Sequence, residues 1–276
     1  MAADYSYAEM LRLTDRIRRP AIEGVLRALE LPPGSHGIDA GCGIGLYTPM
    51  LARLVGPKGY VTGVDTSESF LEEARRETEL LRSARQVDCM IADVTRLPFR
   101  DDSIDWLVSI DTIWPGPAGR GVIGEDTSAI VAELARVVRP GGLVALVFWS
   151  SHRLLPGHPQ LEARLQATAG ATAPFDDTMA PDLHFMAAIS WLTRGGLTDC
   201  TARSAVTDIA APLTAELREA LAVTYHMLWS RSQSELADDD WTAYKRLCDP
   251  DSAEFIADLS GYHGLVTYTA YSGTVG

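Results

Sequence analysis

The chain has 276 residues, enough to bury a sizeable core as one large α/β domain or as a domain with a cap. Its 46% hydrophobic and 22% charged residues are typical of an ordinary globular protein. A formal net charge of −13 argues against a nucleic-acid partner, because such a partner requires a clustered basic face. The longest apolar run, Leu143–Trp149, is too short to cross a bilayer, which argues against a membrane protein.

The first residues of the chain lack the basic and apolar pattern of a secretory signal, so we expect a cytoplasmic protein. Its four cysteines, Cys42, Cys89, Cys200 and Cys248, are far apart and form no CxxC pair. This spacing predicts free thiols in a reducing compartment rather than disulfides or a metal site. No cluster of His, Asp and Glu has the spacing of metal ligands, so we expect no metal.

The chain begins with a segment, residues 3–30, whose apolar residues are spaced as one face of a helix, and Pro20 predicts a break in it. From residue 31 to residue 150, apolar runs alternate with helical patterns. The predicted strands are Gly37–Ala40, Tyr60–Val64, Gln86–Ala92, Ile104–Ile110 and Leu143–Trp149, and the predicted helices are Leu46–Val55, Ser67–Ala84 and Asp126–Val138. Arg139-Pro-Gly-Gly is predicted to be a turn. This alternation predicts a doubly wound, mostly parallel sheet.

After Ser150 the alternation ends. We expect a short helix near 160–169, a helix near Leu183–Arg194, a strand over Thr201–Ile209, an acidic helical stretch over 213–261 and a last strand over Gly264–Gly273. The segments 151–182 and 213–261 are too long for plain connectors and are expected to pack as a cap. The predicted organisation is an N-terminal helical lid (1–30), a cofactor-binding core (31–150) and the remaining strands with their cap insertions (151–276).

One stretch, Gly37-Ile-Asp-Ala-Gly-Cys-Gly-Ile-Gly, has the pattern of a cofactor loop between a strand and a helix. Gly41, Gly43 and Gly45 let the backbone turn sharply and let a ligand approach it closely. Acids stand at the ends of the predicted strands: Asp39, Asp65, Asp93 and Asp111. Ligands of open α/β sheets bind at the carboxyl ends of the strands, where these acids could accept the hydroxyl protons of a ribose and the amine of an adenine.

The dinucleotide fingerprint G-x-G-x-x-G fails in this stretch, because Leu46 stands at its last position, and no P-loop pattern is present. The stretch resembles the first motif of the class I S-adenosylmethionine-dependent methyltransferases. Further matches in order are Gly63-Val-Asp65, Ala92-Asp93 with Leu97-Pro-Phe, Asp102-Ser-Ile-Asp-Trp-Leu-Val-Ser and Glu133-Leu-Ala-Arg-Val-Val-Arg-Pro-Gly-Gly. Within that class the chain is most similar to the small-molecule methyltransferases related to quinone biosynthesis.

The resemblance implies a Rossmann-like sheet of seven strands in the order 3-2-1-4-5-7-6, whose antiparallel last strand Gly264–Gly273 would supply. It implies S-adenosyl-L-methionine as cofactor and S-adenosyl-L-homocysteine as product. Gly41 and Gly43 would line the methionine part with Asp39 as support, and Asp65 with Thr66 would hold the ribose. Asp93 and Val94 would hold the adenine, and Ser109 to Asp111 would face the methionine amine. Trp114 stands where the family usually has a His or a similar residue.

The chemistry then implied is transfer of a methyl group, in line, to carbon or oxygen of a small, apolar or aromatic metabolite. A base is needed only where the acceptor must lose a proton, and His152, just past the fifth strand, is the candidate, ahead of His158, His184 and His226. Tyr7, Trp114 and Trp149 are candidate acceptor-binding residues. Tyr225 and Trp229, four residues apart on one helix, fit core packing at least as well.

Two other kinds of function stay open from the sequence. One is a cyclase on the same fold that uses only the charge of the sulfonium. The other is a nicotinamide-dependent oxidoreductase or a non-catalytic nucleoside-binding module. The oligomeric state is also open, and the apolar N-terminal segment and the cap are surfaces that a homodimer could use.

Overall fold

The structure is a computed structural model that describes residues 5–80, 85–115, 126–175 and 178–276. The chain divides into two compact units. Unit 1 takes residues from 1–22, 150–176 and 205–268, and unit 2 takes residues from 23–149, 177–204 and 269–276. The glycine loop and all four strand-end acids therefore belong to unit 2.

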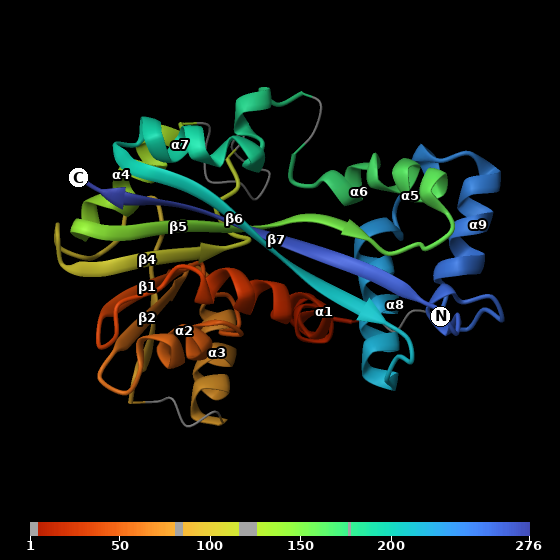
Figure 1. Cartoon of the computed structure of the whole chain (residues 1–276), viewed down its shortest axis with the longest axis horizontal. Helices are drawn as coiled ribbons and strands as arrows, with labels where there is room; N and C mark the ends of the chain where they lie inside the picture. The colour runs from red at the N-terminus through yellow and green to blue at the C-terminus, as the bar shows by residue number, and fades with distance from the viewer. Residues whose placement is uncertain (1–4, 81–84, 116–125, 176–177) are drawn as a thin grey trace. The chain divides into compact units, whose positions relative to one another are not determined.

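Seven strands form one sheet in the order β3-β2-β1-β4-β5-β7-β6. The strands are β1 His36–Ala40, β2 Tyr60–Asp65, β3 Val87–Ile91, β4 Ile104–Ile110, β5 Val138–Arg153, β6 Leu197–Ala210 and β7 His263–Val275. Strands β1 to β5 pair in parallel, with Asp39 opposite Gly63 and Val108. In Figure 1 the arrow of β7 runs against those of its neighbours β5 and β6. The predicted fold class and strand order are thus confirmed.

Helices separate the strands as predicted. The α-helices are α1 Tyr7–Arg27, α2 Thr48–Val55, α3 Glu68–Leu80, α4 Thr127–Val137, α5 Pro159–Gln166, α6 Ala169–Thr172, α7 Ala188–Arg194, α8 Ala215–Trp229 and α9 Asp238–Cys248. Within unit 2, α2 and α3 lie on one side of the sheet and α4 and α7 on the other (Figure 1). Asp126 caps α4 by accepting a hydrogen bond from the backbone N–H of Ala129. The last four residues of the predicted helix 67–84 lie outside the described residues. Most of the Gly/Pro-rich loop after Trp114 also lies outside them.

The prediction of a turn at Arg139-Pro-Gly-Gly is wrong, because strand β5 already begins at Val138. Val138 pairs with Ile104 and Leu143 pairs with Trp106, so five steps along β5 match two steps along β4. The extra residues form an irregularity in the ladder, and Gly141 takes up a positive φ of 78° within it. The breaking residues Pro and Gly thus mark a bulge inside the strand.

The predicted break at Pro20 is also wrong, because α1 continues through it to Arg27. A proline inside a helix disrupts the hydrogen-bond ladder around it. Here the backbone N–H of Ala21 donates to the side-chain hydroxyl of Thr207 on β6, at 2.9 Å. Ala21 and Thr207 are both buried and both belong to unit 1. A distant side chain therefore satisfies a buried donor next to the proline.

The core of unit 2 is the sheet itself, covered on both faces. Ile38, Leu107 and Leu146 on its central strands are fully buried. A Cβ atom at Gly37 would lie 2.1 Å from the ring of Trp106, so this glycine makes room for the indole. The indole N–H of Trp106 donates to Ser35 Oγ at 2.8 Å, which satisfies a buried polar group.

Unit 1 has an aromatic core of its own. The rings of Tyr225 and Trp229 stack with their centroids 5.8 Å apart, so core packing accounts for both residues. Tyr225 and Tyr262 both donate to the carbonyl oxygen of Leu154, at 3.1 Å each.

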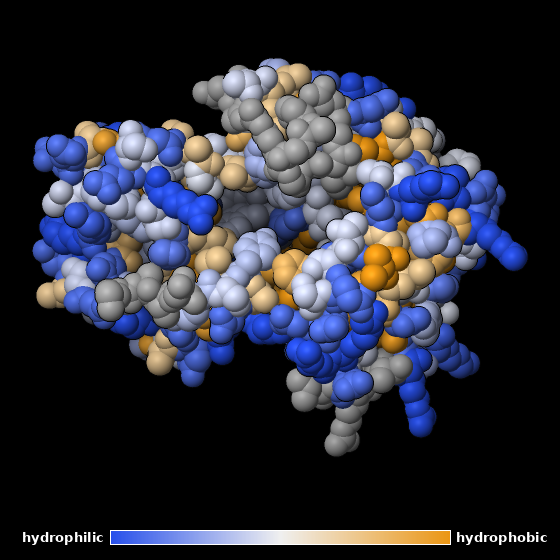
Figure 2. Space-filling view, turned by 180° about the vertical axis from the view of Figure 1, so that it is seen from behind, coloured by the Kyte–Doolittle hydropathy of each residue, from blue (hydrophilic) through white to orange (hydrophobic). Residues whose placement is uncertain are grey.

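On the face shown in Figure 2, hydrophobic residues are interspersed among hydrophilic ones, as on most proteins.

Candidate functional site

The glycine loop follows β1 and holds three glycines at positive φ: Gly41 at 78°, Gly43 at 53° and Gly45 at 77°. A Cβ atom at Gly41 would lie 2.1 Å from Thr112 Cγ2, and one at Gly45 would lie 2.7 Å from Ala74 Cβ. A Cβ atom at Gly43 would meet nothing within 4 Å. Gly41 and Gly45 are thus required by packing, whereas Gly43 faces open space that a ligand can approach.

Asp65 at the end of β2 fixes the conformation of this loop. Its Oδ2 accepts a hydrogen bond from the backbone N–H of Gly43 at 2.9 Å, and its Oδ1 accepts one from Ser67 N, also at 2.9 Å. A carboxylate offers about four acceptor sites, so two remain for the hydroxyl groups of a ligand. Thr66, next in the chain, is exposed at the same edge of the sheet.

Asp39 lies on β1, two residues before Gly41, and is almost fully buried. The hydroxyl of Thr48, in the first turn of α2, donates to its Oδ2 at 2.6 Å. Burial raises the pKa of Asp39 to about 6, because the charged carboxylate is removed from water, while the Thr48 hydrogen bond acts in the opposite direction. Asp39 therefore joins the end of β1 to the start of α2, and the glycine loop lies between these two elements in the chain.

Asp93 follows β3 at the next position of the sheet edge. Its Oδ1 accepts hydrogen bonds from the backbone N–H of Thr95 at 2.8 Å and from the Thr95 hydroxyl at 2.7 Å. Within the part of the chain that the structure describes, its Oδ2 takes part in no hydrogen bond or ion pair. Asp93 is exposed and Val94 beside it is buried in the core of unit 2, so an acceptor and an apolar surface lie next to each other.

The end of β4 is held in place by several hydrogen bonds. Ser109 is buried, and its hydroxyl donates to the carbonyl oxygen of Ala40 at 2.8 Å, so it joins β4 to β1. Asp111 has a positive φ of 49°, and its Oδ1 accepts a hydrogen bond from Trp149 N at 2.8 Å. The carbonyl oxygen of Asp111 accepts one from the indole N–H of Trp114 at 2.9 Å.

Trp114 belongs to a group of aromatic side chains in unit 2. Its ring lies 5.0 Å from that of Phe148 and 6.0 Å from that of Phe185, measured between centroids. Its N–H is used by the Asp111 carbonyl, so the rest of the indole presents only carbon. Trp114 and Trp149 are each partly exposed.

His152 and Tyr7 belong to unit 1. The ring of His152 lies 5.9 Å from that of Trp229. Burial lowers the pKa of His152 to about 4, with a smaller contribution from the charge of Arg153, so the imidazole is neutral at pH 7. The side chain of Tyr7 is 56% exposed. The roles predicted for these two residues stay predictions.

Sequence reasoning missed two features of this site. Thr112, directly after Asp111, contacts Gly41, and only its place beside a predicted strand-end acid could have indicated it. Glu133 and Arg136 stand in a matched motif but had no assigned role, and they bind the loop that follows Asp93.

The described residues contain no group of three or more His, Cys, Asp or Glu side chains that could hold a metal ion. Cys42, Cys89, Cys200 and Cys248 are all free cysteines. In the same described part of the chain, none of the helices has both the length and the apolar character needed to span a membrane.

The residues at this edge of the sheet fit a nucleoside cofactor. Gly43 offers open space, Asp65 has two acceptor sites left, and Asp93 keeps one oxygen available beside buried apolar surface. Acceptors of this kind suit a ribose and an amino-purine, and a loop without Cβ atoms suits the chain attached to them. The fold and the site together define a nucleoside-cofactor domain of the doubly wound class.

Comparison with known proteins identifies the family within this class of domains. Residues 38–146 match the methyltransferase domain family. The chain is 35% identical over 119 residues to demethylmenaquinone methyltransferase of Bacillus cereus, which covers 43% of this chain and 46% of the relative. It is 34% identical over 169 residues to an uncharacterised 37.1 kDa protein in a transposon of Streptomyces fradiae, covering 61% of this chain and 46% of the relative. The chain spans about half the length of the curated relatives it matches.

Solved structures agree in fold. Geranyl diphosphate C-methyltransferase from Streptomyces coelicolor A3(2) is 14% identical, with a TM-score of 0.51, and the match covers 100% of this chain and 86% of that one. Residues 38–146 therefore form a class I S-adenosylmethionine-dependent methyltransferase domain, and the chain is similar in sequence to a demethylmenaquinone methyltransferase. These matches do not favour the cyclase or the nicotinamide-dependent alternative.

Proposed function

We propose that this protein transfers the methyl group of S-adenosylmethionine to a small, apolar or aromatic acceptor. The observation that carries the proposal is that Asp65, which binds Gly43 N, and Asp93 follow neighbouring strands. Strands β2 and β3 pair in register up to Asp65 and Ile91, and Ala92 N donates to the carbonyl oxygen of Asp65 at 3.0 Å. The two acids therefore leave neighbouring strands on the same edge, beside the open glycine.

The proposed division of roles follows the places of these residues at the strand ends. Gly41 and Gly43 would line the methionine part of the cofactor, with the buried Asp39 as support. Asp65 and Thr66 would hold the ribose, and Asp93 with Val94 would hold the adenine. Asp111 would face the methionine amine. The proposed part of Ser109 is indirect, because its hydroxyl is already donated to Ala40.

S-adenosylmethionine, when bound, supplies a methyl group on a sulfonium that is already strongly electrophilic. The protein's task is therefore to hold cofactor and acceptor in line and to keep water away. The strand-end acids and the glycine loop bind and orient, and the buried side chains around them exclude water. No residue has to form a covalent bond for this reaction.

An apolar acceptor is supported by the aromatic group around Trp114. The indole N–H is bound to the Asp111 carbonyl, so Trp114 has no polar group left to offer an acceptor. Its partly exposed ring rests on Phe148 and Phe185. A flat apolar ring of an acceptor could pack on it in offset or edge-to-face geometry. Tyr7 and Trp149 stay proposed acceptor contacts.

His152 stays the proposed base for acceptors that must lose a proton. Its lowered pKa keeps the imidazole neutral at pH 7, as a base requires. A base with a pKa of about 4 is weak, so it suits an acceptor whose proton leaves only as the methyl group is transferred, when that proton has become strongly acidic.

Titration calorimetry and mass spectrometry test the proposal. S-adenosylhomocysteine should bind and NADH should not. Incubation with S-adenosylmethionine carrying a deuterated methyl group and a panel of phenols, indoles and quinones should give products heavier by one deuterated methyl group. Binding of NADH alone would overturn the proposal, and so would turnover of an acceptor without any gain in mass.

A further inference from the structure

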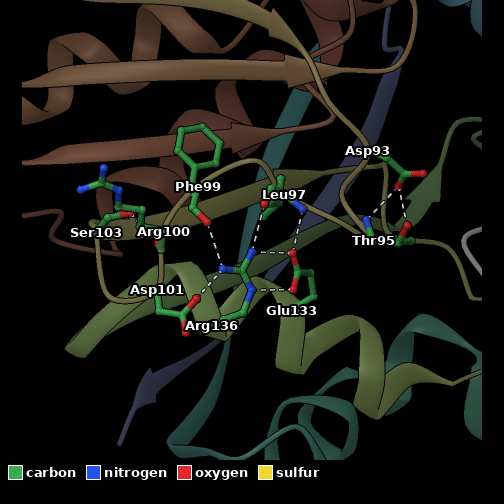
Figure 3. A network of polar contacts seen from close by, with 9 residues as sticks. All are labelled: Asp93, Thr95, Leu97, Phe99, Arg100, Asp101, Ser103, Glu133 and Arg136. Carbon is green, nitrogen blue, oxygen red and sulfur yellow. Dashed lines mark hydrogen bonds and ion pairs between the residues drawn. The ribbon is translucent and has the colours of Figure 1, made fainter.

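Glu133 and Arg136 on α4 bind the loop between Asp93 and Ser103 through one connected set of hydrogen bonds (Figure 3). Arg136 donates from Nε to Glu133 Oε2 at 2.8 Å and from Nη2 to Glu133 Oε1 at 2.8 Å. Its Nη2 also donates to the carbonyl oxygen of Leu97 at 3.0 Å. Its Nη1 donates to the carbonyl oxygen of Phe99 at 2.9 Å and to Asp101 Oδ1 at 2.6 Å.

These five hydrogen bonds use all five N–H donors of the guanidinium, and two of them go to backbone carbonyls of the loop. Glu133 completes the set, because its Oε1 accepts a hydrogen bond from the backbone N–H of Leu97 at 2.7 Å. An ion pair that served only to stabilise a helix would not need to reach the backbone of another segment. This one holds a loop in a defined conformation.

The loop held in this way carries the acid proposed to read the adenine. Asp93 is joined to the bound residues within one turn, because its carbonyl oxygen accepts a hydrogen bond from Arg96 N at 3.0 Å. Leu97, the next residue, is the one that Glu133 and Arg136 bind on both its N–H and its carbonyl. Val94 and Leu97 are both buried in the same core, so the turn is fixed on its apolar side as well.

Asp93 is therefore positioned from two directions. On the strand side, Ala92 N donates to the carbonyl oxygen of Asp65 at 3.0 Å. On the loop side, the position depends on Leu97 and hence on Arg136 and Glu133. We propose that Glu133 and Arg136 are positioning residues for adenine recognition, which hold Asp93 so that its second oxygen can accept a hydrogen bond from the exocyclic amine. This inference rests on the proposed function.

The test compares S-adenosylhomocysteine with its 6-deamino analogue, in which a hydrogen atom replaces the exocyclic amine. The carboxylate of Asp93 accepts from the amine and finds no donor at this position of the analogue, so the wild type should prefer S-adenosylhomocysteine by about tenfold or more. Arg136→Gln removes the hydrogen bonds from the guanidinium to the loop, and we expect this preference to fall below about threefold. Titration calorimetry measures both dissociation constants.

The ratio of the two dissociation constants separates a loss of positioning from a loss of stability. General destabilisation of the protein would weaken the binding of both ligands equally. The matched control is Arg139→Gln, three residues further on, which removes the ion pair of Arg139 with Asp105 at 3.0 Å and leaves the loop untouched. It should keep the wild-type ratio. Glu133→Gln keeps an oxygen for Leu97 N and weakens only the link to Arg136, so an intermediate ratio is expected. It also carries the test if Arg136→Gln does not fold.

The outcomes distinguish this inference from the function on which it rests. If the wild type binds neither ligand, the proposed function fails. If the wild type binds both ligands equally, or if the variants lose affinity while keeping the wild-type ratio, the positioning role is overturned and the methyltransferase proposal is unaffected. A ratio that falls in Arg136→Gln but not in Arg139→Gln supports the inference.

Discussion

The hydroxyl oxygen of Thr112 lies 3.0 Å from the carbonyl oxygen of Gly41 and joins the segment after β4 to the glycine loop after β1. The same hydroxyl also lies 3.0 Å from the carbonyl oxygen of Ile110. The side chain fills the space that a Cβ atom at Gly41 would occupy. Thr112 thus leaves no room for a side chain at position 41, although the two residues are far apart in the sequence.

Removing this hydroxyl should weaken cofactor binding. Thr112→Val keeps the shape of the side chain but leaves the Gly41 carbonyl without its donor, and we expect affinity for S-adenosylhomocysteine to fall by about fivefold to tenfold. Thr112→Ser keeps the donor and should stay within about twofold of the wild type. Titration calorimetry on both variants checks this, and equal losses in the two would contradict it.

Asp65 should matter far more. Asp65→Ala removes the acceptor for Gly43 N and Ser67 N as well as the proposed contacts with the ribose. We expect affinity for S-adenosylhomocysteine to fall by about a hundredfold or more, because several charge-assisted hydrogen bonds are lost together. Circular dichroism should show an intact fold. Unchanged affinity would mean that the ribose binds elsewhere.

Removing the negative charge of Asp39 should make the fold more stable. Its pKa is raised to about 6 from an ordinary value of 3.8, so the folded state binds more protons than the unfolded state between these two values. The neutral carboxyl therefore favours the fold at low pH, and this advantage is lost as pH rises through about 6. Asp39→Asn should raise the free energy of unfolding at pH 7.5 by about 1 to 3 kcal/mol, with little change at pH 4.

Urea unfolding of Asp39→Asn and of the wild type at both pH values measures this difference. The asparagine can still accept the hydrogen bond from Thr48, so the contact itself is kept. A stabilisation of the same size at pH 4 and at pH 7.5 would show that it does not come from the charge of Asp39.

His152 allows a prediction about the pH dependence of catalysis. With a pKa lowered to about 4, the imidazole is neutral throughout the range from about pH 5.5 to pH 8. If His152 is the base, the plot of kcat against pH should show no step from the titration of this residue in that range. His152→Ala should lower kcat for phenolic acceptors. A step near pH 6.5 in the wild type that disappears in the variant would show that the ring titrates as an exposed histidine does.

Thr207 should contribute to stability through the helix that passes Pro20. Thr207→Val leaves the buried N–H of Ala21 without an acceptor, which should cost about 1 to 3 kcal/mol in the free energy of unfolding. Thr207→Ser keeps the oxygen and should recover most of this loss. Chemical unfolding of the two variants checks the prediction, and equal stabilities would show that the N–H is satisfied in another way.

By itself, the sequence determined the order of strands and helices in unit 2 and the acids at the strand ends. Local periodicity sufficed for this order, because a polar residue stands at or just after the end of each of these buried strands, whereas the turn predicted from Arg139-Pro-Gly-Gly proved to be part of β5. Strand β4 begins and ends where its sequence predicts, and Asp65, Asp93 and Asp111 lie at the carboxyl edge as expected. The matched motifs then indicated the cofactor.

Only the tertiary structure decided which of these residues keep an atom for a ligand. The hydroxyl of Ser109 donates to β1, and the indole N–H of Trp114 donates to Asp111. The guanidinium of Arg136 donates to a loop that begins beside Asp93. The continuity of α1 depends on Thr207, which is 186 residues from Ala21. Such pairings arise from the packing of distant segments, so no local pattern in the sequence contains them.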